Sequence, residues 1–349
     1  MKRLIVPNLI SLILGLLLAT GAHAVRMDNL FQIEVDAAGR DRVARDAALQ
    51  QALREVLVRV TGSAETVADP AAQALLKKPG RFVEQYRFRS RPGHAGRPVQ
   101  LRLWVQFDGV SLAREIRHAG LPYWGRERPD VLVWLAVDDR GQRFLVSEST
   151  ENEAAKALLQ AAAQRGLPLT LPLMDLEDQR AVSFTDVWGG FTGSVRAASE
   201  RYRPQVILLG RLERSRRGAD WRAEWTLLGA DDSRSWRTHA DSLAAAVTQG
   251  MAGTGEVLAS QYAVVSADAS LRALVVEDVR GLADYARVMR YLAALAPVET
   301  VQVKRVSGSE VEFDLQLSAD ARSLRQVIAL GKLLQAVDIP EAWRFRLNP

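Results

Sequence analysis

Hydrophobic and polar residues recur with different periods along the first part of the chain. Residues 30–35 alternate with the period of two that is typical of a strand with one buried face. Between residues 43 and 60 the apolar positions instead recur every three or four residues, which predicts a helix that ends at Thr61 and Gly62. The other elements expected here are a short helix near residues 71–76, a hairpin of residues 82–88 and 99–107, and a helix over 111–119. The predicted order is strand, helix, hairpin and helix.

The middle of the chain opens with an apolar run rather than an alternating one. Residues 131–137 are continuously apolar, which is typical of a strand buried on both faces. Residues 221–228 alternate and therefore predict a strand that covers a core with one face. Further strands are expected at 144–146, 167–173, 206–209 and 234–238, and helices at 151–164, 194–202 and 242–262. This pattern predicts a mixed unit that ends in a strand meander and a helix.

The last part of the chain has a simpler order of elements. Strands are expected at 271–276, 300–306, 311–317 and 343–347, and helices at 282–295 and 320–334. Strand, helix, strand, strand, helix, strand is the split order of the ferredoxin-like fold. We therefore expect a ferredoxin-like βαββαβ domain at the carboxyl end.

Proline residues punctuate the joint between the first two parts of the chain. Pro122 and Pro129 bound a stretch with no helical or strand period, which is typical of a connection between domains. The expected fold class is therefore α/β of the α+β kind, built from three small mixed domains of sheet and helix. The predicted boundaries are 25–126 for the first domain, 127–265 for the middle one and 266–349 for the last.

The amino terminus has the three-part pattern of an export signal. Lys2 and Arg3 precede an apolar run over 9–19, and small residues stand before position 25. This pattern predicts a signal peptide over 1–24 with cleavage after Ala24. The apolar run is shorter than the roughly 20 residues of a spanning helix. We expect a soluble periplasmic protein whose mature form has no membrane span.

Composition narrows the chemistry that this protein could perform. The chain has 349 residues, of which 48% are hydrophobic and 25% charged, and these fractions are typical of globular proteins. It contains no cysteine, so disulfides, thiol catalysis and thiolate metal sites are excluded. The formal charge is +5. The basic residues alternate with acidic ones instead of forming a stripe, and no nucleic-acid partner is therefore expected.

The most distinctive short motif runs from Trp188 to Gly193. Its candidate ligand residues are Trp188, Gly189, Gly190 and Gly193. A glycine-rich loop that leads into a helix exposes backbone N–H groups that can bind an anion, and the tryptophan could stack on a sugar or peptide. A tight turn before a packed helix explains the same glycines. Ser194 is a candidate nucleophile for a serine-type hydrolase, although a helix cap accounts for it equally well.

Metal and cofactor chemistry receives little support from the sequence. After the predicted signal the histidines are His94, His118 and His239, each in a different neighbourhood. The acidic residues of the segment 175–178 fall in an expected loop that could hold calcium, but they lack the spacing of a calcium-binding loop. We therefore expect no metal and no cofactor, and interpret the acidic segment as a solvated loop.

Three segments together resemble a known family. They are residues 45–53 with 58–62, residues 128–135, and residues 198–202 with 206–211. Together they resemble a bacterial envelope family known as domain of unknown function 2066. The resemblance implies a periplasmic protein of the Gram-negative type and transfers no catalytic residue. The middle domain also resembles the small α/β modules of envelope-assembly proteins of the TolB and curli-secretion kind, an analogy of fold alone.

These observations lead to one principal hypothesis and two alternatives. The principal hypothesis is a non-enzymatic envelope interaction or assembly factor whose partners are envelope proteins or cell-wall components. The first alternative is a periplasmic glycan- or peptide-binding protein that uses the Trp188–Gly193 loop, and the second is a serine-type hydrolase. The sequence leaves the partner and the oligomeric state open.

Overall fold

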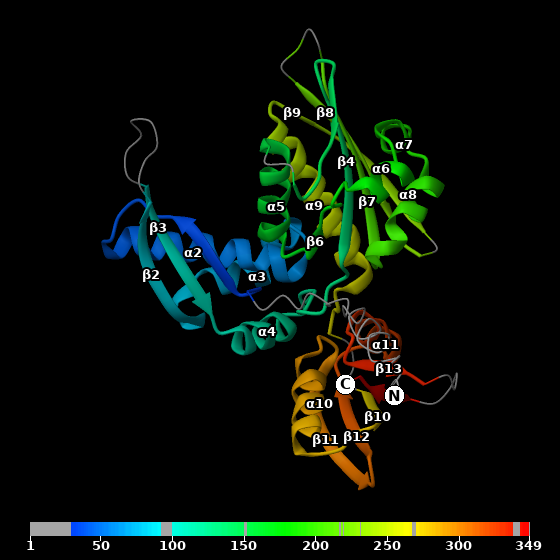
Figure 1. Ribbon diagram of the computed structural model, residues 1–349. Coiled ribbons are helices and arrows are strands. Elements are labelled where there is room, and N and C mark those ends of the chain that lie inside the picture. Colours follow the sequence, from blue (N-terminus) through cyan, green and yellow to red (C-terminus); the bar gives the residue numbers. More distant parts are fainter. Residues whose placement is uncertain are drawn as a thin grey trace, which may run out of the picture.

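The computed structural model describes residues 29–91, 100–149, 152–215, 218, 220–230, 232–266, 270–337 and 343–348. The predicted signal peptide over 1–24, with its cleavage after Ala24, lies outside these residues, as does His94. Three separate sheets, each packed against helices, confirm the α+β class (Figure 1). We call each sheet with its helices the first, middle and last unit. The division into domains at 126 and 265 stays a prediction.

The first unit is a three-stranded antiparallel sheet with helices on its inner face. Its strands are β1 (Gln32–Asp36), β2 (Val83–Arg91) and β3 (Gln100–Phe107), in the order β1-β3-β2. Its helices are α2 (Arg42–Thr61), α3 (Pro70–Leu76) and α4 (Gly109–His118), with short 3₁₀ turns at Glu65–Ala68 and Pro79–Phe82. Helix α2 packs against β1 and β3, where its Leu53, Val56 and Leu57 are fully buried. Strand β2 forms one edge of the sheet.

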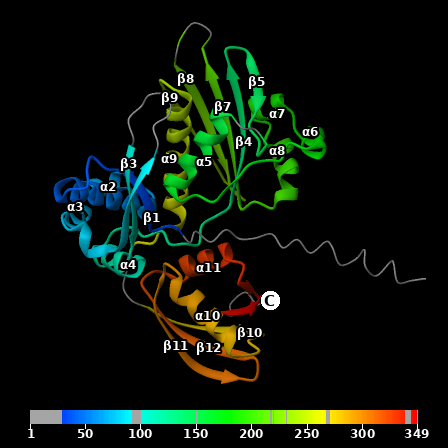
Figure 2. The ribbon, with the colours of Figure 1, turned by 60° about the vertical axis from the view of Figure 1, so that its left-hand side comes forward.

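The middle unit has helices on both faces of a six-stranded mixed sheet. The strands are β4 (Val131–Asp139), β5 (Gln142–Leu145), β6 (Leu169–Thr170), β7 (Val206–Arg214), β8 (Trp221–Leu228) and β9 (Ser233–Ala240), in the order β5-β4-β7-β8-β9 with β6 beside β4. Helices α5 (Glu153–Arg165) and α9 (Leu243–Tyr262) cover one face (Figure 2). Helices α6 (Leu176–Ala181), α7 (Phe184–Gly189) and α8 (Thr192–Ser199) cover the other.

Strand β4 shows why a continuous apolar run belongs between two layers of helices. Val131, Val133 and Leu135 point into the core beneath α5 and α9. The alternate residues Leu132 and Trp134 point into the core beneath α6, α7 and α8. Because side chains alternate across a strand, both sets must be apolar when both faces are covered.

The segment between β6 and β7 differs from its prediction. The acidic stretch 175–178, expected to be a loop, forms the start of α6. Helix α7 follows in a stretch for which the sequence predicts no regular element. Both helices have six residues, which is too short for a hydrophobic period to show. The predicted strand over 167–173 is reduced to Leu169–Thr170.

The last unit has a split βαβ order with one additional strand. Its elements are β10 (Ser270–Glu277), α10 (Leu282–Ala294), β11 (Val298–Ser307), β12 (Glu310–Leu317), α11 (Ala321–Leu330), β13 (Leu334–Ala336) and β14 (Arg344–Leu347). The sheet order is β11-β12-β10-β14-β13, with α10 and α11 packed on one face.

The additional strand β13 changes the direction of the last strand. The helix predicted over 320–334 ends at Leu330, and Gly331, which follows in an extended conformation, lies so close to the ring of Tyr291 that a side chain would not fit. Residues 334–336 then form β13, and β14 turns back to pair with β10 in parallel. In a βαββαβ unit the last strand follows the helix directly and would run antiparallel to the first.

Candidate functional site

The predicted ligand loop is the joint between α7 and α8. The ring of Trp188 stacks on that of Phe184 with the centroids 5.3 Å apart. The backbone carbonyl oxygen of Trp188 accepts a hydrogen bond of 3.0 Å from Arg211 Nη1. Gly190, with φ of 69°, ends α7 in the left-handed conformation and donates its N–H to the carbonyl oxygen of Asp186. A left-handed helix end explains this glycine without a ligand.

The start of α8 is exposed and carries the remaining candidates. Gly189, at the end of α7, and Gly193, in the first turn of α8, are both exposed, and Ser194 is half-buried. A Cβ at Gly193 would meet nothing within 4 Å, so packing does not require glycine there. Among the described residues, Ser194 forms no hydrogen bond to either His118 or His239. Ligand binding and hydrolysis at this joint stay predictions.

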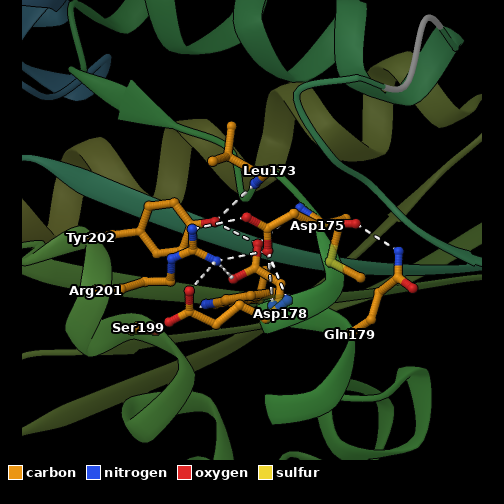
Figure 3. A network of polar contacts seen from close by, with 10 residues as sticks. Leu173, Asp175, Asp178, Gln179, Ser199, Arg201 and Tyr202 are labelled. Atoms are coloured by element: carbon orange, nitrogen blue, oxygen red, sulfur yellow. Dashed lines mark hydrogen bonds and ion pairs between the residues drawn. The ribbon is translucent and has the colours of Figure 1, made fainter.

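The acidic segment 175–178 is part of a polar network (Figure 3). Asp175 caps α6 and accepts hydrogen bonds of 2.7 and 2.9 Å from both terminal nitrogens of Arg201. Asp178 is fully buried. It accepts hydrogen bonds from Tyr202 Oη at 2.5 Å, from the Met174 N–H at 2.8 Å and from Arg201 at 3.1 Å. The network ties α6 to the turn Glu200–Tyr202 that follows α8.

Charge and burial account for the ionisation of this network. The hydrogen bonds from Arg201 hold the pKa of Asp175 well below its usual range, and the same pair raises the pKa of Arg201. Burial, together with the hydrogen bond to Asp178, raises the pKa of Tyr202 to about 12. Within the part of the chain that the structure describes, no group of three histidine or acidic residues is placed to bind a metal ion. The segment predicted to be solvated is instead ion-paired and partly buried.

Two buried arginines join the first and middle units. Arg59, near the end of α2, donates from Nε to the carbonyl oxygen of Gln164 at 3.1 Å. Its Nη1 donates to the carbonyl oxygens of Leu30 at 3.1 Å and Gln32 at 2.8 Å. Arg59 therefore connects the end of α5 to the chain around β1.

Arg128 continues this connection from the joint between the units. Its Nη1 donates at 3.1 Å to the carbonyl oxygens of both Arg165 and Gly166, and its Nη2 donates at 2.8 Å to the carbonyl oxygen of Arg59. The guanidinium also lies 4.0 Å from the ring centroid of Trp124. We call Arg59, Arg128 and the carbonyl groups that they bind the arginine joint.

In the arginine joint, the dipoles of backbone carbonyl groups stabilise the two positive charges. Burial lowers the pKa of Arg59 to about 10 and that of Arg128 to about 9, and the charge of Arg59 contributes to the second shift. Both guanidinium groups donate their hydrogen bonds to backbone carbonyl oxygens. Planar guanidinium groups with five donors suit such a cluster of acceptors.

The three segments singled out in the sequence contact one another in pairs, and the first two meet at the arginine joint. Arg59 belongs to the first segment and Arg128 to the second, and the two are hydrogen-bonded. Trp134 of the second segment donates from Nε1 to Ser199 Oγ of the third at 2.9 Å. The role of Arg59 was not predicted, although this arginine lies three residues after Val56, on the apolar face of its helix.

A groove also lies away from this joint, between α2 and β2. Its volume is about 920 Å³. We call it the β2 groove; it is lined by Arg45, Asp46, Ala47, Leu49 and Gln50 of α2 and by residues 76–81 and 83–86. Leu49 and Leu76 are buried at its floor, and the Tyr86 side chain is 41% exposed. Nothing in the sequence pattern marks this groove, because its walls come from three separate segments.

Comparison with known families gives a match for the first unit alone. Residues 24–125 match a family model described as a domain of unknown function (DUF8605). This match confirms the prediction of a domain of unknown function. The matched residues include both the lining of the β2 groove and Arg59. Comparison with curated proteins and with solved structures gives no match.

None of the helices in the described ranges is both long and apolar enough to cross a bilayer.

Proposed function

We propose that this protein is an exported, non-enzymatic interaction or assembly factor of a Gram-negative type of cell envelope. The observation that carries the proposal is the β2 groove, which opens beside the edge strand of the first sheet. Grooves between a helix and an edge strand are used to bind extended segments of other proteins. Its partners are envelope proteins or cell-wall components.

The arginine joint supports this role by fixing the unit that carries the groove. Arg59 and Arg128 hold the end of α2 to α5 through buried hydrogen bonds. The first core also includes Ala296 and Ala319 of the last unit, so packing adds to the connection. A surface held in one conformation loses less entropy when a partner binds.

The proposed location rests on the sequence. The pattern of residues 1–24 is that of a cleaved signal peptide, and the segments 45–62, 128–135 and 198–211 together resemble domain of unknown function 2066. The resemblance of the middle unit to modules of envelope-assembly proteins is in keeping with this location.

Export is tested by expressing the full chain in a Gram-negative host and sequencing the amino terminus of the periplasmic form. We expect it to begin at Val25. Leu14→Arg places a charge in the apolar run and should retain the uncleaved chain in the cytoplasm, whereas Thr20→Ser should be processed normally. A wild-type chain that keeps Met1 in the cytoplasmic fraction would contradict the proposed location.

The interaction role is tested by cross-linking the tagged full chain in living cells and identifying the attached proteins. We expect discrete envelope partners, recovered in smaller amounts when Tyr86→Ala removes the aromatic wall of the β2 groove. The exposed Arg322, which lies on α11 outside the groove, provides the control Arg322→Ala. Turnover of an envelope substrate by the pure protein, abolished by a single polar substitution, would show that the protein is an enzyme.

A further inference from the structure

We propose that the β2 groove binds an extended, acidic segment of a partner protein, which adds to the first sheet as a fourth strand beside β2. This inference rests on the proposed interaction function and names the chemistry of the partner. Three features carry it: the free edge of β2, two partly exposed aromatic rings on the inner face of this strand, and the basic rim of the groove.

The first feature is the edge of β2. The sheet order β1-β3-β2 leaves β2 paired on one side only, with β3. A bulge at Glu84 interrupts the register, and from Gln85 to Arg91 the pairing with β3 is regular. Every second residue of such an edge directs its N–H and C=O groups away from the sheet, where another strand can pair with them. The regular part is long enough for a segment of about six residues.

The second feature is the inner face of β2. Tyr86 and Phe88 are in register with the buried residues Val105 and Leu103 of β3, so they point to the core side of the sheet. Because α2 packs over β1 and β3, it leaves these two rings partly exposed. The rings contact each other edge to face, with their centroids 6.3 Å apart. Alternate side chains of an added strand would point to the same face and cover the rings. The segment should therefore be apolar at every second position.

The third feature is the charge of the rim. Lys77 and Lys78 are exposed, and among the described residues neither makes an ion pair. The other two basic residues are already partnered: Arg45 pairs with Asp46 at 2.7 Å, and Arg81 pairs with Glu115 at 3.3 Å.

Among the acidic residues of the lining, Glu84 makes no ion pair with the described residues. Two unpaired lysines therefore face one unpaired glutamate, and the net charge of these unpaired groups is positive. Acidic side chains of the bound segment would be attracted to the two lysines at the rim of the groove.

Two other edge strands, β11 and β9, lack this combination. Strand β11 also ends a sheet, but its Lys304 and Arg305 are paired with Glu312. Strand β9 has its Trp236 packed against Gly253 of α9. Among the described grooves, the β2 groove alone has a lining that includes an edge strand and unpaired lysines.

The experiment uses the full chain and a fluorescein-labelled heptapeptide, Glu-Val-Glu-Phe-Glu-Val-Glu. Fluorescence anisotropy should show saturable binding, and amide hydrogen exchange should slow over 85–91 and stay unchanged in β9 and β11. The double variant Lys77→Glu/Lys78→Glu should bind the peptide about tenfold more weakly, because two attractions become repulsions. The variant Lys156→Glu/Arg322→Glu changes net charge equally on other units and should bind as the wild type does.

Two further probes separate strand pairing from charge alone. A peptide of the same sequence with N-methylated backbone amides keeps its charge but cannot pair, and it should not bind. The proposal is overturned if the methylated peptide, the lysine version of the peptide or a thymidine heptanucleotide binds as tightly. Absence of binding by the acidic peptide, or protection outside β2, overturns it as well.

The outcome is distinguishable from failure of the proposed function. If the acidic peptide does not bind but Lys77→Glu/Lys78→Glu still cross-links to the same envelope partners, the interaction role stands and the groove is not its site. If the folded wild-type chain cross-links to no envelope component, the proposed function itself fails.

Discussion

Arg59, Arg128 and Asp178 are charged residues with less than a tenth of their surface exposed. Each is held by several hydrogen bonds, as a buried charge must be. The two arginines bind backbone carbonyl groups, whereas Asp178 binds the side chains of Arg201 and Tyr202 and one N–H. At this scale the molecule uses polar side chains to fix segments that are distant in sequence.

The Asp175–Arg201 pair predicts how stability responds to acid. The pKa of Asp175 lies below its ordinary value of 3.8 in the folded protein, so the unfolded chain takes up the proton first. The contribution of the ionised Asp175 to the free energy of unfolding is fully present well above pH 3.8. It is lost as the pH falls below that value towards the pKa of the folded protein. Urea unfolding of wild type and Asp175→Asn should therefore show a stability difference at pH 6 that narrows below pH 3.8. A difference that is constant over this range would contradict the assignment.

At the scale of elements, hydrophobic period predicted the long helices and strands well. Helix α2, strand β4 and strand β8 lie where their patterns of apolar residues predict them. Each of them packs against a hydrophobic core along its whole length, so the pattern continues from end to end. Helices α6 and α7 were not predicted, since six residues give fewer than two turns of a period. The strand β13 was missed because its pairing with β14 is not a local property.

Gly62 shows how the end of one helix is fitted to another unit. Its φ is 80°, and a Cβ there would lie 2.0 Å from the Cβ of Ala259 in α9. Gly62→Ala should lower the free energy of unfolding by about 2–4 kcal/mol, from the left-handed conformation and the overpacking together. Gly120 has a φ of 68° and nothing within 4 Å, so Gly120→Ala should cost about 1 kcal/mol. Equal losses in urea titrations of the two variants would contradict the proposed contact.

At the scale of the whole molecule, the arginine joint and the shared core couple the units. The first core includes Val264, Ala296 and Ala319, which follow it by more than a hundred residues. Tyr123 also forms an isolated β-bridge with Val264, beside the end of α9. The first unit is therefore packed as part of a larger body, with its β2 edge left open.

Arg128→Lys tests the coupling between the units. Lysine lacks the planar fork and leaves several buried carbonyl groups without a donor, so stability should fall by about 2–4 kcal/mol. Calorimetry should also show the first and middle units unfolding together in wild type and less cooperatively in the variant. The exposed Arg222 provides the control Arg222→Lys, which should change stability by less than about 0.5 kcal/mol. Unfolding of the wild-type units in separate transitions would contradict this role for the joint.

The sequence by itself determined the α+β class and the positions of the long elements, because period and capping are local properties of the chain. It also singled out three segments, of which the first two meet at the arginine joint. Only the tertiary structure decided that Arg59 and Arg128 are buried, that the acidic segment 175–178 is paired with Arg201, and that β2 borders a groove. Burial, pairing and an open edge depend on which distant segments pack together, and no local pattern records that choice.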